Sequence, residues 1–306
     1  IYMCWDDSTD YSSQELRNMV LDFYKYDLGE NEIYWDHRRM GYADGVVATS
    51  WQSAYVLNRF HNCKEHFYFV QDFEPWFYPK GSLYFLSENT YKLGYKGFTA
   101  GLFLADKLKR DYGMECFGFR FSYDRSLYSY HEKKDDKKKI FFYARPYTAR
   151  REFELGVLAL TLLYKKHPDL IVVMAGQSVS DYPFDFPVID KGVMAPDKMS
   201  ELYGECDMCL VLSATNLSLL PLEVMASGSV VVSDRGEHNE WELNDDNSIL
   251  CDADPWELSK TMDYYFEHRD ELIKKRKAGR EYAERITWEQ EIDKLSEYII
   301  RNINSK

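Results

Sequence analysis

The sequence predicts an α/β chain of two halves, each built on a parallel, doubly wound sheet. Two observations predict this class. Short apolar runs alternate with stretches of helical periodicity through most of the 306 residues, as expected of buried strands joined by crossover helices. Between the halves, residues 132–139 (EKKDDKKK) form a charge run that offers nothing to a core, so we expect a solvated hinge there.

In the first half, Leu16, Met19, Val20 and Phe23 have the spacing of one apolar helix face. Apolar runs rich in Val, Phe and Tyr predict strands, and longer periodic stretches predict helices. We expect strands at residues 1–5, 46–49, 67–70 and 116–119, and helices at residues 14–26, 52–60, 83–93 and 102–112.

In the second half, strands are expected at residues 140–144, 170–175, 208–212 and 230–233, alternating with helices that include residues 153–164 and 196–203. Residues 182–187 are rich in aromatic residues and proline and predict a loop. The last stretch keeps Trp288, Ile292, Leu295 and Ile299 on one face, which predicts an amphipathic helix.

Residues 209–234 (CLVLSATNLSLLPLEVMASGSVVVSD) predict a strand, a polar loop, a short helix and a second strand around one acidic residue, Glu223. Such a helix directs its free N–H groups and positive dipole end to the edge of the sheet, where a phosphate group would bind. Glu223 lies in the first turn, where a carboxylate can accept hydrogen bonds from ribose hydroxyls. The alternative is that Glu223 only complements the helix dipole.

Three arginines, Arg145, Arg150 and Arg151, follow the apolar run that ends at Ala144. Open α/β sheets bind ligands at the carboxyl ends of their strands, and guanidinium groups suit phosphate oxygens. A solvated arginine cluster would account for one or two of these residues equally well. Taken with Glu223, the arginines predict a site for a nucleoside diphosphate.

These two segments together resemble the donor half of family 4 glycosyltransferases, which have the GT-B fold. The family pattern has an arginine after a strand, a second basic residue five or six positions later, and a Glu-x7-Glu motif. The matching residues are Arg145, then Arg150 or Arg151, and Glu223 in the run EVMASG. The first glutamate of the motif would fall at Thr215. Its role must be filled otherwise, by Asn216, Ser218 or backbone groups.

The first half resembles one branch of this family, the rhamnosyltransferases of the WsaF type. The similar segments are GVVATSW at residues 45–51 and FYFVQDFEPWFYP at residues 67–79, then Gly81, Ser82, Glu88, Thr90 and Tyr91. In these enzymes a serine-rich segment ends in Pro-Leu-Glu, as residues 221–223 do here. The resemblance implies transfer of L-rhamnose from dTDP-rhamnose onto a growing cell-surface polysaccharide, with retention of the anomeric configuration.

The resemblance also implies how the chain is divided. Residues 1–125 would form an acceptor-side Rossmann-like domain, shortened at its start if the chain is part of a longer protein, and residues 126–286 the donor domain, with a cleft between the two. Residues 287–306 would form a helix that crosses back to the first domain. The donor-binding residues implied are Arg145, Arg150, Arg151, Gly192, Val193, Ser218, Leu219, Leu220 and Glu223, with the base and ribose near Gly192 and Val193.

The leaving diphosphate gains negative charge as the sugar–phosphate bond breaks, so a metal or fixed cations must stabilise it. We assign this catalytic role to Arg145 with Arg150 or Arg151, and to the helix start at residues 218–220. The Asp-x-Asp sequence at residues 252–254 precedes a proline and predicts a helix cap. We therefore expect no metal and no cofactor besides the nucleotide-sugar donor.

On the acceptor side, Asp72 and Glu74 follow a predicted strand. Either carboxylate could accept the proton of the acceptor hydroxyl or position that hydroxyl. The alternative is that both carboxylates cap the turn around Pro75.

Composition limits the partners. Aromatic residues make up 16% of the chain, which suits stacking on sugars, although most of them belong to the core. The net charge of −13 disfavours nucleic acid, while the lysines of residues 133–139 could contact an anionic membrane locally. Neither a membrane span nor a signal peptide is visible in the sequence, which predicts a cytoplasmic location, at the inner face of the membrane if that contact forms. The chain begins at Ile1 without a methionine, so we expect an excised part of a longer protein.

The six cysteines are scattered. Cys206 and Cys209 have the C-x2-C spacing, but no second cysteine or histidine pair stands near them in the sequence. We therefore expect that these cysteines are reduced thiols and that they do not bind zinc.

Two alternative functions remain open. A UDP-hexose could be the donor instead of dTDP-rhamnose. A GT-B module that binds sugar or nucleotide without catalysis would account for the missing first glutamate. A nicotinamide-dependent oxidoreductase fits poorly, because no Gly-x-Gly-x-x-Gly follows a predicted strand.

Overall fold

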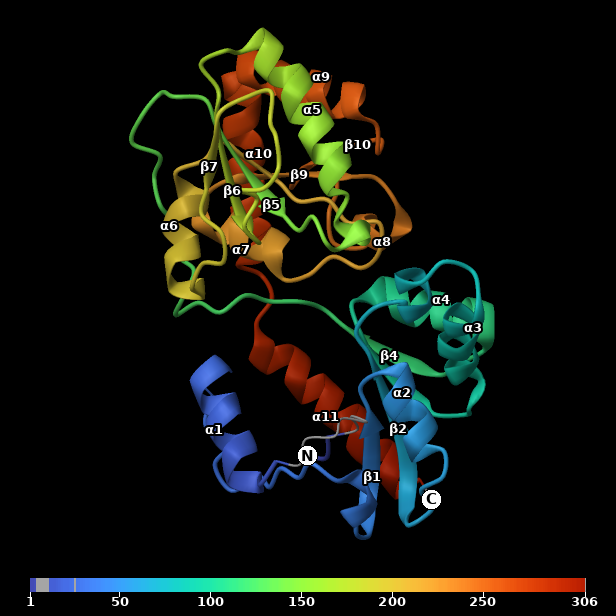
Figure 1. The fold of residues 1–306 in the computed structure, drawn as a ribbon. Helices are drawn as coiled ribbons and strands as arrows, with labels where there is room; N and C mark the ends of the chain where they lie inside the picture. Colours follow the sequence, from blue (N-terminus) through green and yellow to red (C-terminus); the bar gives the residue numbers. More distant parts are fainter. Residues whose placement is uncertain (4–10, 25, 306) are drawn as a thin grey trace.

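The computed structural model describes residues 1–3, 11–24 and 26–305, which form two α/β domains, one above the other in Figure 1. The N-terminal domain has a four-stranded sheet in the order β1-β2-β3-β4, and the C-terminal domain a six-stranded sheet in the order β10-β9-β8-β5-β6-β7. All the pairs within these two sheets are parallel. The predicted fold class is therefore confirmed.

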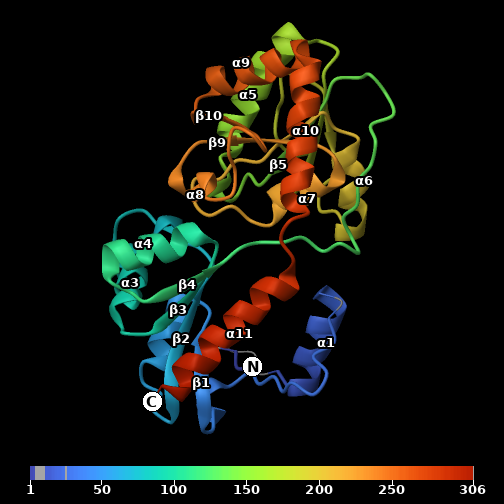
Figure 2. The ribbon, with the colours of Figure 1, turned by 180° about the vertical axis from the view of Figure 1, so that it is seen from behind.

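The N-terminal sheet is covered on both faces. Its strands are β1 (Ala43–Ala48), β2 (Cys63–Val70), β3 (Lys96–Ala100) and β4 (Cys116–Phe119), and its helices are α2 (Trp51–Leu57), α3 (Ser82–Asn89) and α4 (Leu102–Tyr112). Along β2, Tyr68 and Val70 share a buried cluster with Leu104 of α4, whereas Phe67 on the other face joins the cluster of Tyr298. Tyr298 belongs to α11 (Trp288–Asn304), which packs on β2 and β4 and is seen in front of the sheet in Figure 2.

The C-terminal sheet is doubly wound. Its strands are β5 (Lys139–Ala144), β6 (Ile171–Gly176), β7 (Val188–Asp190), β8 (Met208–Leu210), β9 (Val230–Asp234) and β10 (Ile249–Cys251). The chain passes from β5 outward to β6 and β7, then returns to place β8 on the other side of β5. The strand order therefore reverses between β5 and β8, and such a reversal is where open α/β sheets bind ligands.

Helices cover both faces of the C-terminal sheet as well. These helices are α5 (Phe153–Lys166), α6 (Met199–Gly204), α7 (Leu220–Ser227), α8 (Glu237–Glu240), α9 (Pro255–Glu267) and α10 (Arg269–Ala283). Alternate residues of β5 serve the two faces, since Phe142 packs in the cluster of Leu160 on α5 and Phe141 in the cluster of Met225 on α7. Asp254 caps α9 by accepting hydrogen bonds from the N–H groups of Trp256 and Glu257, as the sequence predicts.

Shorter elements complete the fold. Single 3₁₀ turns lie at His37–Arg39, Glu74–Phe77, Thr90–Lys92, Ala149–Arg151 and Pro196–Lys198. Helix α1 (Ser13–Tyr24) stands apart from both sheets in Figures 1 and 2 and contributes Leu16 to a small cluster with Leu28 and Ile33. Of the strand expected at residues 1–5, the structure describes a single bridge between Tyr2 and Tyr34, and Cys4 and Trp5 lie outside the described residues.

The connection between the domains is anchored to the protein at several points. Phe121, Tyr123 and Tyr128 lie between β4 and β5 and belong to one apolar cluster with residues of both domains. Farther along, the ammonium group of Lys133 donates to the carbonyl oxygen of Lys137 at 2.6 Å and lies 3.6 Å from a carboxylate oxygen of Asp207. The Lys133 side chain is therefore folded back onto the protein, whereas Glu132, Lys134, Asp136 and Lys137 are exposed, as expected of a solvated charge run at residues 132–139.

None of the helices in the described part of the chain has the length and apolar character needed to cross a bilayer.

Candidate active site

Three arginines stand at the carboxyl edge of the C-terminal sheet, beside the reversal of strand order. Arg145 follows β5 directly and donates through Nη1 to the hydroxyl of Tyr143 at 2.9 Å. Arg151 donates through Nη1 to Ser213 Oγ at 3.0 Å, in the loop that follows β8. The guanidinium of Arg150 lies over the ring of Phe77, 4.3 Å from its centroid, in the N-terminal domain. The loops on both sides of the reversal are therefore joined by the arginines that the sequence singled out.

The arginine cluster carries more positive charge than its surroundings neutralise. In the described part of the chain, the carboxylate paired with this cluster is Asp72, whose Oδ2 lies 3.8 Å from Arg150 Nε. Burial lowers the pKa of Arg151, and the neighbouring charges of Arg150 and Arg145 lower it further. Buried guanidinium groups with spare donors suit an anion with several oxygens, such as a diphosphate.

Glu223 lies in the first turn of α7, on the other side of the same edge. Burial raises the pKa of its carboxyl group to about 7, and a hydrogen bond from the Tyr128 hydroxyl acts in the opposite direction. Burial raises the pKa of Tyr203 well above its usual range, and the negative charge of Glu223 raises it further.

The other predicted donor residues border this edge. Ser218 accepts through Oγ from the N–H of Leu220 at 3.3 Å, just before the start of α7. Gly192 follows β7 with φ 55°, a left-handed conformation that favours glycine, and its carbonyl oxygen accepts from the N–H of Gly176 at 2.9 Å. Val193 is 83% exposed, so an apolar surface is free beside that loop.

The two acceptor-side carboxylates have different surroundings. Asp72 lies at the seam between the domains and accepts through Oδ2 from Thr215 Oγ1 at 2.9 Å. Glu74 is buried inside the N-terminal domain, where it accepts from the N–H of Trp51 at 2.9 Å and from the hydroxyl of Tyr68 at 2.5 Å. Glu74 thus caps the start of α2, which fits a structural carboxylate and places it away from the arginines.

Several buried polar atoms at this edge have no hydrogen-bond partner in the described residues. These atoms are Arg145 Nε, Arg150 Nε, Glu152 Oε2, Asn216 Oδ1 and Asn239 Oδ1. Native proteins leave few buried polar groups unpaired, so a concentration of them indicates where a polar ligand completes the hydrogen bonding.

Sequence reasoning missed a second acidic group next to the arginines. Glu152 has φ 51° and is the sole non-glycine residue with positive φ among the described residues. Burial, followed by the charge of Asp234, raises the pKa of Glu152 to about 7. Asp234 in turn lies 3.2 Å from Nε2 of His238. A left-handed glutamate has no signature in a single sequence, but Asp234 closes the very segment around Glu223 and could have been considered.

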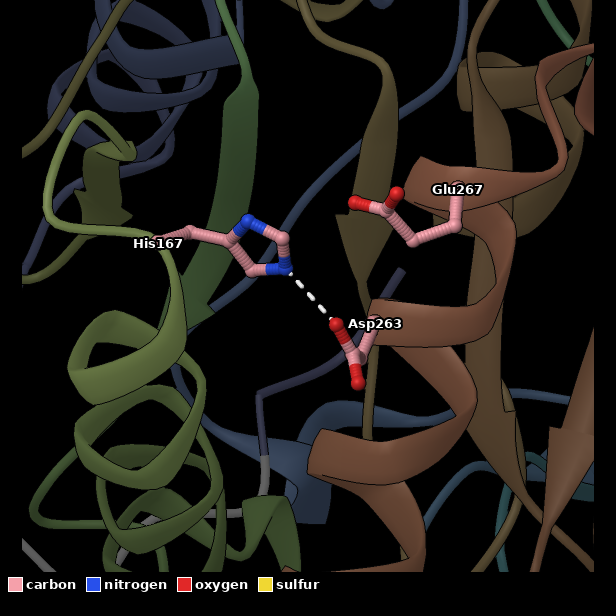
Figure 3. Close-up of side chains that lie close together, drawn as sticks. All are labelled: His167, Asp263 and Glu267. Carbon is pink, nitrogen blue, oxygen red and sulfur yellow. Dashed lines mark hydrogen bonds and ion pairs between the residues drawn. The ribbon is translucent and has the colours of Figure 1, made fainter.

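One group of side chains in the described ranges has the spacing of metal ligands, and it lies elsewhere. His167, Asp263 and Glu267 converge in Figure 3 between the end of α5 and α9. The ring of His167 is held through Nε2 by Asp263 at 2.8 Å and through Nδ1 by the Lys138 ammonium at 2.7 Å. Lys166 occupies the second oxygen of Asp263 at 2.7 Å. Because lysines already take these ligand atoms, the group acts as an ion-pair network that joins α5 to α9.

Solved structures identify the class of fold. Sucrose-phosphate synthase from Thermosynechococcus elongatus matches with a TM-score of 0.73 and 13% identity, over 97% of this chain and 82% of its own. HepE from Anabaena, solved with UDP and glucose, matches with a TM-score of 0.66 and 13% identity, over 84% of this chain and 77% of its own. The fold is that of the GT-B glycosyltransferases, as predicted.

Sequence comparison then identifies the family. Residues 138–263 match the family described as WsaF, C-terminal domain. The O-antigen biosynthesis protein RfbC from Myxococcus xanthus is 32% identical over 268 residues, which cover 82% of this chain and 20% of that protein. The chain thus has the GT-B fold and resembles proteins of the WsaF type, and it spans about a fifth of the length of the curated relative that it matches.

Proposed function

We propose that this chain transfers a sugar from a nucleoside diphosphate to a glycan acceptor. The observation that carries the proposal is the arginine cluster at the reversal of strand order between β5 and β8. Arg145, Arg150 and Arg151 bind the diphosphate in this proposal, and the start of α7 at residues 218–220 contributes N–H groups. Glu223 accepts hydrogen bonds from the ribose hydroxyls, and the base lies against Gly192 and Val193.

In the transfer step, the bond between the anomeric carbon and the diphosphate oxygen breaks, and the electron pair leaves with the diphosphate. The acceptor hydroxyl oxygen forms the new bond to the same carbon and gives its proton to the carboxylate of Asp72. The arginines stabilise the charge that develops on the leaving group, because they are fixed in place before the reaction begins. Retention of configuration and independence from metal ions belong to this proposal.

On the acceptor side, the proposal assigns a role to Asp72 and none to Glu74. Asp72 accepts from Thr215 Oγ1, from the N–H of Asn216 at 3.1 Å and from its neighbour Phe73 at 2.8 Å, which leaves capacity for one more donor on the carboxylate. A hydroxyl of the acceptor can fill it. Glu74 has both oxygens engaged inside its own domain.

The donor proposed is dTDP-rhamnose and the acceptor is a growing surface polysaccharide. The WsaF-type domain at residues 138–263 supports the donor, and the similarity to an O-antigen biosynthesis protein supports the acceptor. The alternative of a UDP-hexose is favoured by HepE, which was solved with UDP-glucose.

Calorimetric titration with dTDP, UDP, GDP and their sugars tests this proposal. We expect dTDP and dTDP-rhamnose to bind best, followed by release of dTDP when a glycan acceptor is added. Tighter binding of UDP or GDP would exclude the rhamnose donor. Absence of binding by any nucleotide would refute the transferase proposal, and binding without hydrolysis or transfer would indicate an inactive module.

The pH dependence of nucleotide binding reports on Glu223. Its carboxyl group has a pKa of about 7 in the free protein, and ribose hydroxyls bind the ionised form best. Below pH 7 the proton must be released before binding, so the affinity for dTDP should fall about tenfold between pH 8 and pH 6. The terminal phosphate also titrates near pH 6. The pH dependence of the affinity for dTDP is therefore compared with that of Glu223→Gln, which should lack the part that comes from the Glu223 carboxyl group. Parallel curves for the two proteins would remove Glu223 from the ribose site.

A further inference from the structure

The two domains meet through a small set of hydrogen bonds beside the arginine cluster. The loop after β2 brings Asp72, whose carboxylate accepts from the hydroxyl of Thr215 at 2.9 Å and from the N–H of Asn216 at 3.1 Å. In return, Nδ2 of Asn216 donates to the carbonyl oxygens of Gln71 at 3.1 Å and Ala100 at 2.7 Å. Four hydrogen bonds thus connect two residues of the donor domain to two loops of the other domain.

This arrangement fixes the side-chain amide of Asn216. Its Nδ2 donates to two carbonyl oxygens. If the amide were flipped, Oδ1 would face these two acceptors, so the nitrogen and oxygen cannot be exchanged. The opposite atom, Oδ1, is buried and has no partner in the described part of the chain, and Asn216 as a whole is 3% exposed. The domain interface therefore leaves one oriented acceptor unsatisfied.

Asn216 belongs to the same loop that binds the arginines. Ser213 accepts from Arg151 at 3.0 Å and donates through the same Oγ to the carbonyl oxygen of Asn216 at 3.2 Å. A sugar attached to a diphosphate on the arginines would extend from Arg151 toward this loop, and its hydroxyl groups are the donors that an unpaired amide oxygen requires.

We propose that Asn216 is a specificity-determining residue that accepts a hydrogen bond from a hydroxyl of the donor sugar. The N-terminal domain orients it to do so, because Gln71 and Ala100 hold the side-chain amide and Asp72 holds the Asn216 N–H. The inference rests on the proposed function and adds the group that recognises the sugar unit rather than the nucleotide. Sugar recognition is then coupled to domain contact, because Asn216 is oriented by carbonyl groups of the facing domain.

The test compares a nucleoside diphosphate with its sugar in the parent protein and in Asn216→Ala. We expect the dissociation constant of dTDP to stay within about twofold, while that of the nucleotide sugar rises about tenfold, as for one lost hydrogen bond. Asn247→Ala is the matched control, since Asn247 is also 3% exposed and donates to a backbone carbonyl, that of Glu242. Equal effects on both ligands, or no effect on either, would overturn the inference.

The domain coupling is tested by Asp72→Ala, measured without acceptor. Asp72 holds the backbone of the loop that carries Asn216 against the facing domain. If that contact keeps the Asn216 amide in place, this variant loses affinity for the nucleotide sugar alone, and the double variant loses no more than Asn216→Ala does. Additive losses would refute the coupling. If Asn216→Ala does not fold, the affinity of the parent protein for nucleotide sugars that each lack one sugar hydroxyl is measured instead. An affinity that is the same whichever sugar hydroxyl is missing would refute recognition of a sugar hydroxyl by Asn216. Failure of the parent to bind any nucleoside diphosphate would instead refute the proposed function.

Discussion

Replacing Arg145 with alanine will slow sugar transfer about a hundredfold, which corresponds to about 3 kcal/mol of lost transition-state stabilisation. Arg145 follows β5 directly and its Nη1 is held by the Tyr143 hydroxyl, while its Nε is buried and has no hydrogen-bond partner among the described residues. It is therefore positioned before a ligand arrives, and within the described ranges it forms no ion pair that a ligand would have to break. The measurement is kcat for release of the nucleoside diphosphate from the sugar donor that binds best.

Arg235→Ala is the matched control for this experiment. Arg235 also follows a strand of the same sheet, β9, but it pairs with Asp245 at 2.7 Å and with Glu240 at 3.3 Å on the surface. Its charge is already compensated, and exposed ion pairs contribute little. We expect kcat within about twofold of the parent. Similar rates for the parent and Arg145→Ala would show that the leaving group is stabilised elsewhere.

Sequence reasoning brought the arginines and Glu223 to the carboxyl edge of one sheet because that information is local. Arg145 to Arg151 stand within one loop after a strongly apolar strand, and Glu223 stands within one short helix. A strand of a parallel sheet is buried on both of its faces, so the end of an apolar run in the sequence indicates where the strand ends. Ligands bind at the carboxyl ends of such strands. Every step of that argument needs only neighbours in the sequence.

The hydrogen bonds between the domains could not be predicted in this way, because the residues that form them are far apart in the chain. Asp72 and Thr215 are separated by 143 residues, and Asn216 contacts Ala100 across 116. The sequence showed that Thr215 lacks a carboxylate, but not that a carboxylate from the other domain binds its hydroxyl. It also gave no reason to separate Asp72 from Glu74, which are two residues apart and face different environments.

The strands that the sequence missed are short or contain glycine. β7 and β10 have three residues each, too few for a period to appear. β3 (Lys96–Ala100) contains Gly97, and a side chain there would collide with Cys116 on the neighbouring strand. Glycine lowers strand propensity, so Gly97, which lets β3 fit between its neighbours, also prevented β3 from being predicted.

Replacing Asp207 with alanine will destabilise the C-terminal domain by about 3 kcal/mol, because Lys133 and Arg269 lose a buried carboxylate partner and the N–H of Lys139 loses its acceptor. Asp207 is fully buried at the start of β8. Its carboxylate accepts from the N–H of Lys139 at 2.9 Å and from Arg269 at 2.5 Å, and lies 3.6 Å from the ammonium of Lys133. This single residue therefore joins β5, β8, α10 and the connection between the domains. The measurement is the free energy of unfolding in urea.

Asp197→Ala removes the same side chain from an exposed ion pair, 3.5 Å from Lys198, and should change stability by less than about 0.5 kcal/mol. Asp207→Asn should fall between the two, since an amide oxygen can still accept from Lys139 but cannot neutralise two cations. Asp207 also explains why Lys133, unlike the exposed residues of the charge run at 132–139, is folded back onto the protein. A lysine in such a run is solvated only if no buried carboxylate lies within reach, and that carboxylate is 74 positions away from Lys133. If Asp207→Ala unfolds like Asp197→Ala, Lys133 is held by Asp135 and the backbone alone, and the connection between the domains is free to move as a hinge.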